Sequence, residues 1–282
     1  MAVGEEVRCA VGVPNAEATG DVGVLVDLAQ RAEAAEWDGF FIWDHLQYRD
    51  TGWPAVDPWV ALAAVAVATS TIKLGVMVTP LSRRRPAKVA RETATLDQLC
   101  GGRFIFGAGL GSKAEHEFVP FGDEGDARTR ADMLDESLEI LAGLWSGEPF
   151  AHHGEHYTVE ETTFLPTPVQ RPRIPVWIAG RWPAKRPMRR AARWDGVFPL
   201  DDETPEGGVM APERLAEIVA YVREHREDDS AFDVTTEGPS EPGVPILAPY
   251  AEAGLTWWVE RLSWNRGPLQ ERAARIDAGP PC

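Results

Sequence analysis

The stretch IKLGVMVTPLSRRRPAKVARETATLDQLCGGRFIFGAGLG, from Ile72 to Gly111, contains a strand, a helix and a second strand in one unbroken unit. The apolar, β-branched run from Ile72 to Thr79 ends at Pro80 and is typical of a parallel strand buried on both faces. Apolar residues at helical spacing predict a helix over Pro86–Leu99, since proline is tolerated in a first turn. The second strand, Phe104 to Ala108, runs into a glycine-containing turn. The unit therefore predicts an α/β fold with a parallel sheet.

Both strands of this unit bring their C-terminal ends to the same rim of the sheet. Two parallel strands joined by a helix form a right-handed crossover. The segments that leave those ends are Thr79-Pro80 and Gly109 to Ser112. Ligands of α/β proteins bind at this rim, so we expect the functional site there.

Strand-like and helix-like runs alternate along almost the whole chain. The expected strands are Val7–Val13, Gly39–Trp43, Ile72–Thr79, Phe104–Gly109, Val176–Ala179, Gly196–Leu200, Phe232–Thr236 and Thr256–Glu260. The expected helices are Asp21–Ala35, Pro58–Thr69, Pro86–Leu99, Thr129–Trp145, Arg186–Arg193, Pro212–Arg226 and Leu269–Ala278. Eight strands with interleaved helices predict a closed (β/α)8 TIM barrel rather than an open doubly wound sheet.

One segment, Gly111 to Arg173, departs from this alternation. Within it His152 to Leu165 alternates around a turn at Gly154, as a small hairpin does. We interpret residues 111–173 as an insertion-bearing excursion after the fourth strand, and residues 1–282 as one barrel domain.

Composition excludes several classes of partner. The formal charge is -16, and binding to nucleic acid or an anionic membrane depends on clustered lysine and arginine, so neither partner is expected. The three cysteines are far apart, which indicates neither a disulfide framework nor a zinc cluster. No charged-then-apolar leader opens the chain, and the longest apolar stretch, Val60 to Ala68, is too short to span a bilayer. We therefore expect a cytoplasmic protein.

The short basic run Arg83 to Arg85 follows the C-terminal end of the strand that ends at Thr79. Such a run is more often a solvated loop, but its position at a strand end slightly favours contact with an anionic cofactor tail or substrate.

A carboxylate and an imidazole end the second expected strand, at Asp44 and His45. His45 can donate or accept a proton near neutral pH, and Asp44 can accept a hydrogen bond from an NH-bearing cofactor. The structural alternative is an aspartate that caps the next segment and a histidine bonded to a backbone carbonyl. The location at a strand's C-terminal end favours function.

The histidines do not have the spacing of a metal site. Neither a His-x-His at a strand end nor a His-Glu-x-x-His helix occurs, and His152, His153 and His156 fall on the expected hairpin. We therefore predict no metal site, and a metal-dependent barrel hydrolase is disfavoured.

Two further strand ends offer backbone groups to a phosphate. The turn Gly107 to Ser112 is rich in glycine but lacks the Gly-Lys-Ser/Thr order of a P-loop, and a tight strand-to-loop turn explains it equally well. The fifth strand ends at Gly180-Arg181, and barrels often bind a phosphate late in the strand order.

Eleven tryptophans are present, several near expected strand ends. Most such aromatic residues belong to a core, but Trp53 and Trp258 are candidates for the wall of a substrate pocket. Glu260 lies two residues beyond Trp258 on the same strand face, so we expect it to enter that pocket as well.

Several separated motifs, in order along nearly the whole chain, resemble the bacterial luciferase-like monooxygenase superfamily of flavin- and deazaflavin-dependent oxidoreductases. They are GFFIWDH (Gly39–His45), LGVMVTP (Leu74–Pro80), ATLD (Ala94–Asp97), GGR (Gly101–Arg103), GLGS (Gly109–Ser112), LDESLEIL (Leu134–Leu141), PVWIAGR (Pro175–Arg181) and RAARWDG (Arg190–Gly196). The resemblance implies a TIM barrel with an insertion and a flavin or deazaflavin ring at the C-terminal rim.

The resemblance also implies roles for individual residues. It makes His45 the catalytic residue and places a non-prolyl cis peptide between Met77 and Val78, behind the ring. It places the cofactor against Asp44, Met77, Val78, Thr79, Gly109, Gly111, Ser112, Ala179, Gly180 and Arg181. Where some deazaflavin-dependent relatives carry a glutamate proton donor after the glycine turn, this chain has Lys113-Ala114 with Glu115 nearby, which argues against a sugar-phosphate dehydrogenase.

The resemblance predicts an oxidoreductase that uses reduced FMN or coenzyme F420 on a small organic substrate, either as a monooxygenase or by hydride transfer. A flavin or F420 reductase is an expected partner, and a homodimer is an expected assembly. The alternative from a different class is a barrel that binds a flavin or small ligand without turnover, because fold alone does not establish catalysis.

Overall fold

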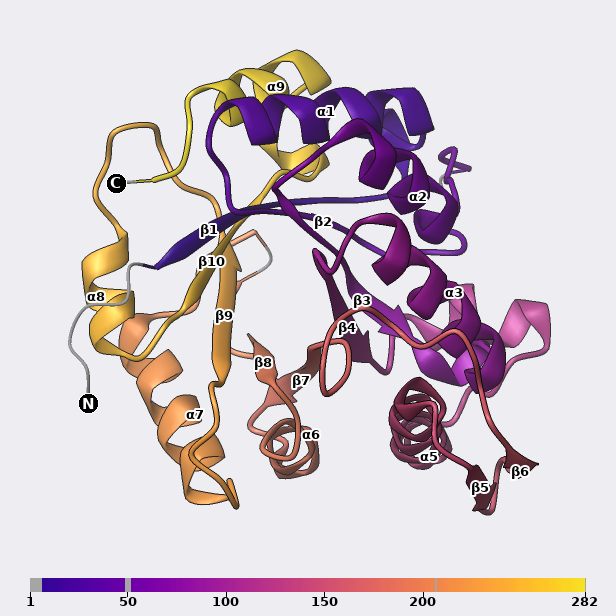
Figure 1. Cartoon of the computed structure of the whole chain (residues 1–282). Coiled ribbons are helices and arrows are strands. Elements are labelled where there is room, and N and C mark those ends of the chain that lie inside the picture. The colour runs from indigo at the N-terminus through magenta and orange to yellow at the C-terminus, as the bar shows by residue number, and fades with distance from the viewer. Residues whose placement is uncertain (1–6, 49–51, 206, 282) are drawn as a thin grey trace.

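The computed structural model describes residues 7–48, 52–205 and 207–281, and eight of its strands close into a parallel barrel (Figure 1). The barrel strands are β1 (Arg8–Val13), β2 (Gly39–Ile42), β3 (Lys73–Pro80), β4 (Phe104–Gly109), β7 (Val176–Trp182), β8 (Gly196–Asp201), β9 (Asp233–Gly238) and β10 (Trp257–Arg261). Each strand pairs with its neighbours along the chain, and β10 pairs with β1 to close the ring. The predicted (β/α)8 barrel is confirmed.

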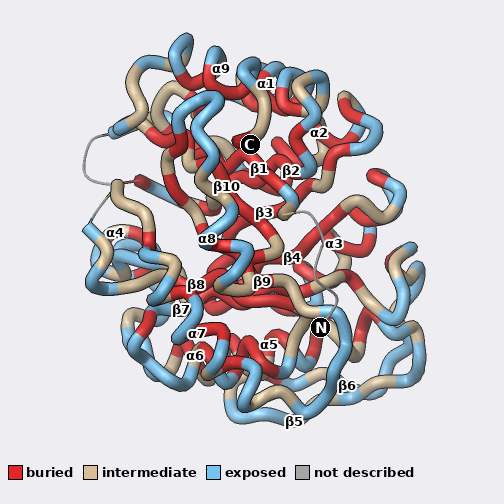
Figure 2. The backbone as a smooth tube through the Cα atoms, turned by 90° about the vertical axis from the view of Figure 1, so that its left-hand side faces the viewer, coloured by how far each residue is buried: buried red, intermediate tan, exposed pale blue. Residues whose placement is uncertain are grey.

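Seven helices match the predicted ones to within a few residues at each end. They are α1 (Val22–Ala34), α2 (Pro58–Ala68), α3 (Pro86–Leu99), α5 (Ala127–Ser146), α6 (Lys185–Ala191), α7 (Pro212–Glu224) and α9 (Leu269–Asp277). They surround the buried strands as a more exposed outer layer (Figure 2). In the part of the chain that the structure describes, no helix combines the length and apolarity needed to cross a bilayer.

Two short helices, α4 (Ala114–Glu117) and α8 (Leu247–Glu252), were not predicted. Four and six residues are too few to show a helical period, and Pro249 lies inside α8. The chain also forms the 3-10 turns η1 (Glu17–Thr19), η3 (Leu81–Arg83), η4 (Val119–Phe121) and η5 (Trp264–Arg266). Of these elements α4 and η3 carry residues of the candidate site.

Aspartates fix where three of the long helices begin. The side chain of Asp21 accepts a hydrogen bond from the backbone of Val24 at the start of α1. Asp57 does the same for α2 just before Pro58, and Asp126 for α5. An aspartate at this position accepts hydrogen bonds from backbone N–H groups that have no partner inside the helix. The first residues of these helices can therefore be predicted from the sequence.

Large rings fill the inside of the barrel and face glycines on neighbouring strands. The rings of Phe41, Trp177 and Trp257 lie with centroids 5.4, 5.5 and 5.9 Å apart in pairs. A Cβ on Gly75 would lie 2.6 Å from the backbone oxygen of Ile105 and 3.0 Å from the Phe41 ring. The interior therefore has room for these rings only because glycine stands opposite them.

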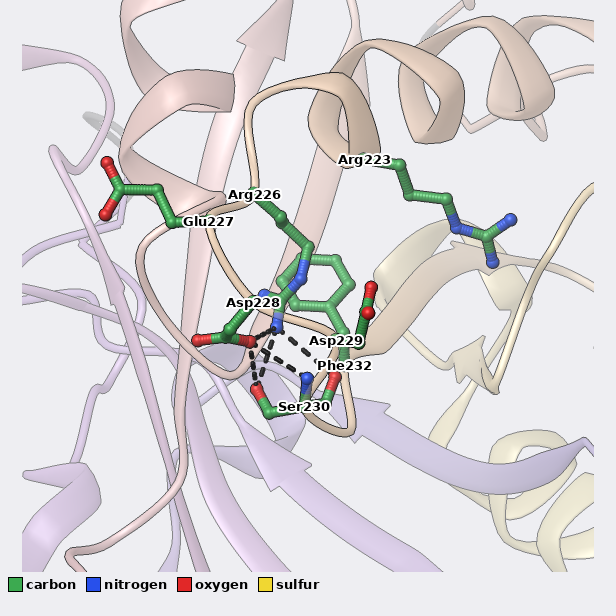
Figure 3. Close-up of a pocket in the computed structure, with 7 residues that line it drawn as sticks. All are labelled: Arg223, Arg226, Glu227, Asp228, Asp229, Ser230 and Phe232. Carbon is green, nitrogen blue, oxygen red and sulfur yellow. Dashed lines mark hydrogen bonds and ion pairs between the residues drawn. The ribbon is translucent and has the colours of Figure 1, made fainter.

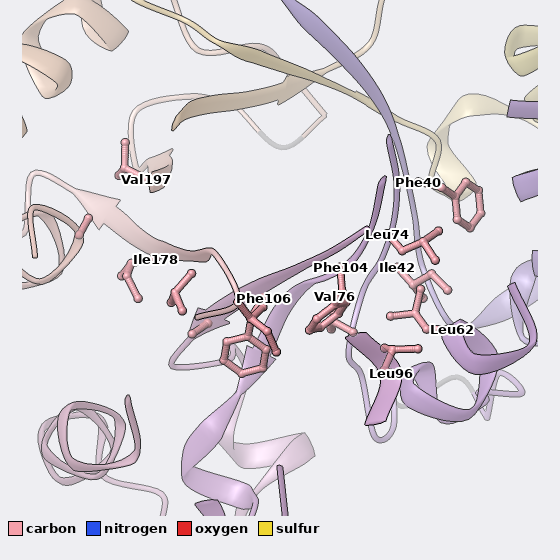
Figure 4. Packing of buried hydrophobic residues seen from close by; sticks show 14 of the residues in the cluster. Phe40, Ile42, Leu62, Leu74, Val76, Leu96, Phe104, Phe106, Ile178 and Val197 are labelled. Carbon is pink, nitrogen blue, oxygen red and sulfur yellow. The ribbon is translucent and has the colours of Figure 1, made fainter. Parts of the chain in front are cut away.

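A second apolar core lies between the barrel and its helices (Figure 4). Among its buried members are Phe40, Ile42, Leu62, Leu74, Val76, Leu96, Phe104, Phe106, Ile178 and Val197. Because strands β2, β3 and β4 bury both faces, their sequences are continuously apolar rather than alternating.

The predicted hairpin is present as β5 (Phe150–His153) and β6 (Thr158–Thr162), an antiparallel pair at the outer edge of the molecule near α5 (Figure 1). The side chain of Glu136 on α5 accepts hydrogen bonds from the backbone N–H groups of Glu155, His156 and Tyr157 in its turn. This carboxylate ties the hairpin to α5, away from the C-terminal rim.

We expect Gly75→Ala to lower the free energy of unfolding by about 3 kcal/mol, because the added Cβ meets a backbone oxygen that cannot move independently. The matched control is Gly101→Ala. A Cβ there meets nothing within 4 Å, so only its left-handed φ of 63° should cost stability, about 1 kcal/mol. Urea unfolding followed by circular dichroism measures both variants, and equal losses would contradict the steric account of the barrel interior.

Candidate functional site

A cavity of about 550 Å³ opens at the C-terminal rim of the barrel, among the ends of β2, β3, β4 and β7 and the first turns of α5 and α6. Ten of the eleven residues predicted as catalytic or cofactor-binding line it. They are Asp44, His45, Met77, Val78, Gly109, Gly111, Ser112, Ala179, Gly180 and Arg181. Its volume lies in the range of ligand pockets, about 300–1,000 Å³.

His45 forms a short hydrogen bond to a buried carboxylate. Its Nδ1 lies 2.6 Å from Oε1 of Glu117, whose side chain is only 2% exposed. Burial would raise the pKa of Glu117, but the hydrogen bond and charge of His45 and the charge of Arg83 outweigh it and hold the pKa below its usual value. Glu117 is therefore an anion that fixes the imidazole through Nδ1 and leaves Nε2 for the cavity.

The backbone of His45 is held separately from its ring. The amide of the buried Asn15 donates from Nδ2 to the carbonyl oxygen of His45 and accepts at Oδ1 from its backbone N–H. Asn15 also donates to the carbonyl oxygen of Val56. These contacts fix the backbone of the loop that follows β2, and with it the position of the His45 side chain.

In the basic run after β3, Arg83 and Arg84 bond within the protein, whereas Arg85 is exposed, so the solvated interpretation holds for Arg85 alone. None of the three lines the cavity, which corrects the expectation of contact with an anionic cofactor tail or substrate. Arg83, with a side chain 4% exposed, donates to Oδ1 of Asp44 at 2.7 Å and to Oε2 of Glu117 at 3.0 Å. Arg84 donates to both carboxylate oxygens of Asp44, at 3.0 and 2.9 Å. Asp44 lines the cavity, but its carboxylate is committed to these two guanidinium groups.

Met77 and Val78 form an apolar wall of the cavity, and the peptide bond between them is cis, as predicted. The register of β3 against β4 shifts between Val76 and Thr79, a bulge that turns both side chains toward the interior. A Cβ on Gly109 would lie 2.7 Å from Cγ2 of Val78. The glycine turn therefore packs directly against this wall.

The far arm of the cavity is basic. Arg128, Arg186 and Arg190, from α5 and α6, line it. Burial would raise the pKa of Asp135, but Arg190 and Arg186, with Nε–Oδ1 and Nη2–Oδ2 distances of 2.5 and 2.7 Å, hold it below its usual value. Arg186 also pairs with Asp132, so two carboxylates offset the charges of Arg186 and Arg190, and the charge of Arg128 remains to favour an anionic group on a ligand.

Trp258 and Glu260 lie elsewhere, which corrects their assignment to a substrate pocket. In β10 the side chains of Trp257 and Val259 pack inside the barrel, so the alternating Trp258 and Glu260 face the helices. Both are fully buried, and Glu260 accepts hydrogen bonds from Ser240 and the indole of Trp258. Both faces of the strand begin with a tryptophan, Trp257 on one and Trp258 on the other, so its sequence did not reveal which face was inside.

Thr79 is also misplaced by the prediction. It is fully buried, and its register partner Ala108 packs in the outer core, so Thr79 faces the helices rather than the cavity. Trp53 lies at the rim in an aromatic cluster, stacked on Tyr48 with centroids 5.8 Å apart and 5.4 Å from Trp264. The Tyr48 ring is in turn 4.3 Å from the ring of His45.

Another cavity, about 410 Å³, lies at the opposite end of the barrel, in the loop between α7 and β9 (Figure 3). Three of its polar side chains bond to one another, since Arg226 donates to both Asp228 and Ser230. Across the described ranges, no group of three or more His, Cys, Asp or Glu side chains is placed to hold a metal ion. The C-terminal rim therefore remains the candidate site.

Sequence reasoning missed Glu117, and its signal was weak. The glutamate lies 72 positions from His45 on a four-residue helix without a period. The neighbouring Glu115, which the sequence analysis considered, is exposed at 69% of its side chain. Only the fold brings Glu117 under His45.

The chain is similar in sequence to a known protein family and to several of its members. Residues 8–239 match the model of the luciferase-like monooxygenase family. An uncharacterized protein of Mycobacterium tuberculosis is 32% identical over 284 residues, covering 91% of both chains. The F420-dependent glucose-6-phosphate dehydrogenase of Nakamurella multipartita is 36% identical over 187 residues, covering 64% of this chain and about half, 53%, of that protein.

Solved structures show the same fold at low sequence identity. An F420-dependent secondary alcohol dehydrogenase in complex with an F420-acetone adduct superposes with a TM-score of 0.77 at 17% identity, covering 97% of this chain and 98% of that one. The oxygenating constituent of 3,6-diketocamphane monooxygenase from Pseudomonas putida, in complex with FMN, gives 0.64 at 22%, covering 82% and 67%. With the family model matched over most of its length, the chain belongs to the luciferase-like monooxygenase family.

Proposed function

We propose that this protein is an F420-dependent oxidoreductase that acts on a small alcohol or carbonyl compound. The observation that carries the proposal is the His45–Glu117 pair, an acid–base group at the edge of a mainly apolar cavity. The named F420-dependent dehydrogenase among the relatives supports this choice of cofactor, although the match spans about half of that protein.

The residues around the cavity fit the two parts of such a cofactor. The apolar wall of Met77 and Val78 and the glycine turn at Gly109 suit a flat ring. The basic arm with Arg128 and Arg186 suits an anionic tail. Bound there, the cofactor would supply the hydride chemistry, while the protein contributes position, charge and exclusion of water.

His45 would move the proton of the substrate hydroxyl or carbonyl. With Nδ1 donating to the Glu117 carboxylate, Nε2 accepts a proton during oxidation of an alcohol and returns it in the reverse reaction. Arg83 bonds to the same carboxylate and, after His45 itself, helps to hold its pKa below the usual value, so that the imidazolium formed in this step has a counter-charge.

The second candidate is an FMN-dependent monooxygenase, favoured by the likeness in fold to the FMN-bound camphane enzyme. The same cavity would hold the FMN ring, and a separate reductase would supply the reduced flavin. Tests of cofactor preference separate the two candidates.

Titration of the purified chain with F420 and with FMN, followed by fluorescence and calorimetry, should show F420 binding at least about tenfold more tightly. The physical reason is that the basic arm can meet the longer anionic tail, an interaction that weakens with added salt. Tighter binding of FMN would favour the monooxygenase, and binding of neither cofactor would contradict both candidates.

The test substrate is the alcohol that best accelerates reduction of bound F420, or the ketone that best accelerates its reoxidation. On that substrate we expect His45→Asn to lower kcat by about 10²–10⁴-fold. Glu117→Gln should lower it by about 10- to 100-fold, because the imidazole loses a charged hydrogen-bond partner. Stopped-flow absorbance measures both variants.

The matched control is Glu115→Gln, two residues earlier on the same short helix and exposed, which should leave kcat unchanged. Unaltered F420 affinity and unfolding midpoint in His45→Asn would show that only catalysis was affected. If no compound in a broad panel changes the reoxidation rate, the protein is a binder without turnover.

A further inference from the structure

A second cavity, about 660 Å³, adjoins the first at the same rim. It lies over the ends of β8, β9 and β10 and under the loop that carries Gly207, Gly208 and Met210. The residues that line both cavities are Gly111, Ser112, Arg181, Leu200 and Glu237. The two cavities therefore share one wall, and a ligand in the second faces whatever occupies the first.

Glu237 stands at this junction. Its register partner on β10, Val259, packs inside the barrel, so the Glu237 side chain points into the interior rather than toward the helices. It is 16% exposed, and Arg261 donates to its Oε1 at 3.3 Å. Among the described residues no partner bonds to Oε2. Burial raises the pKa of this carboxyl above its usual value, although the charge and hydrogen bond of Arg261 oppose the shift.

Arg261 is fixed beside it. Its Nη2 donates to the carbonyl oxygen of Gly208 at 3.0 Å, its Nη1 donates to Glu237, and its side chain is 14% exposed. A guanidinium has five N–H donors, so donors remain for a ligand in the second cavity. A hydrogen-bond acceptor on Glu237 and donors on Arg261 thus lie side by side.

We propose that the second cavity is the substrate chamber and that Glu237 and Arg261 recognise the hydroxyl group of an uncharged substrate. The inference rests on the proposed function for the position of the cofactor in the first cavity. A hydroxyl is both donor and acceptor, so it can donate to Oε2 of Glu237 while it accepts from Arg261.

The charge balance of the pair selects against ionic substrates. The other charged side chains of this cavity lie apart from the pair: Arg181 pairs with Asp202, Asp201 lies 3.6 Å from Arg214, and Lys113 is exposed. Because Glu237 and Arg261 compensate each other, an ammonium or carboxylate ligand would meet one group of opposite charge and one of like charge, and would lose its hydration. A hydroxyl avoids both costs. A site built to bond a hydroxyl also rejects the analogue that lacks it, since its buried polar groups are then left unpaired.

The simpler role for the pair is to join β9 to β10. Two other contacts already do this, because the strands pair in parallel over Trp257 to Glu260, and Thr256 bonds to the backbone of Val234. The position of Glu237 on both cavity walls is not required by that role.

The experiment measures binding of four cyclohexane probes to the F420-loaded full chain by ligand-observed NMR: cyclohexanol, cyclohexylamine, cyclohexanecarboxylate and methylcyclohexane. The wild type should bind cyclohexanol most tightly. Glu237→Leu should weaken cyclohexanol about 10- to 100-fold and leave methylcyclohexane unchanged, the loss expected for a hydrogen bond to a charged group. Glu237→Gln, which keeps the shape and an acceptor for Arg261, should weaken cyclohexanol about tenfold and serves if the leucine variant does not fold.

Glu241→Gln is the control, since that glutamate is four residues further on and 73% exposed, and it should change no affinity. Tightest binding of the amine or the carboxylate, or a cyclohexanol affinity that neither Glu237 variant changes, would overturn the inference. Binding is measured without turnover. If cyclohexanol binding depends on Glu237 but F420-loaded enzyme oxidises no alcohol, the proposed reaction fails and the chamber assignment stands.

Discussion

The candidate site depends on buried charge that is almost completely paired within the protein. Arg83 is buried between two carboxylates, those of Asp44 and Glu117, which come from the end of β2 and from α4. An unpaired charge at this depth would lower the free energy of unfolding by several kcal/mol. None of the three groups can therefore leave its position without leaving a buried charge unpaired. The network thereby fixes three separate chain segments relative to one another, and it fixes Glu117 under the imidazole of His45.

The barrel interior sets the depth of the site. Phe41, Trp177 and Trp257 fill the lower part of the barrel, and Met77 closes the layer above them on the side of β3. The cavity therefore opens at the C-terminal rim, where β4 ends in Gly109. Gly75 makes room for the Phe41 ring inside the barrel, whereas Gly109 lets the end of β4 pack closely against Val78 in the cavity wall.

Much of the fold could be predicted because buried parallel strands and capped helices leave local signals. The run Ile72 to Thr79 and the aspartate before Pro58 are examples, and the structure has a strand and a helix start at those places. Which face of β10 points into the barrel could not be predicted. Trp257 and Trp258 are equally apolar, and only closure of the barrel decides which of them faces inward. Motif-bearing residues such as His45 were found, but Glu117 was not, because pairing across 72 positions has no local signal.

The two cavities differ in the side chains that line them, which suits them to different parts of the proposed reaction. The first has its apolar wall and basic arm on β3, β4, α5 and α6, whereas the second adds polar side chains from β8, β9 and β10, such as Asp201, Glu237 and Arg261. In the proposed reaction the acid–base group and the recognition group are then separated, with His45 on one side of the rim and Glu237 on the other. Each carboxylate is tuned by its own arginine: Arg83, with His45, lowers the pKa of Glu117, while Arg261 only partly offsets the burial that raises the pKa of Glu237. One carboxylate is thus held as an anion that orients the imidazole of His45, and the other lines both cavities, where we propose that it meets the substrate.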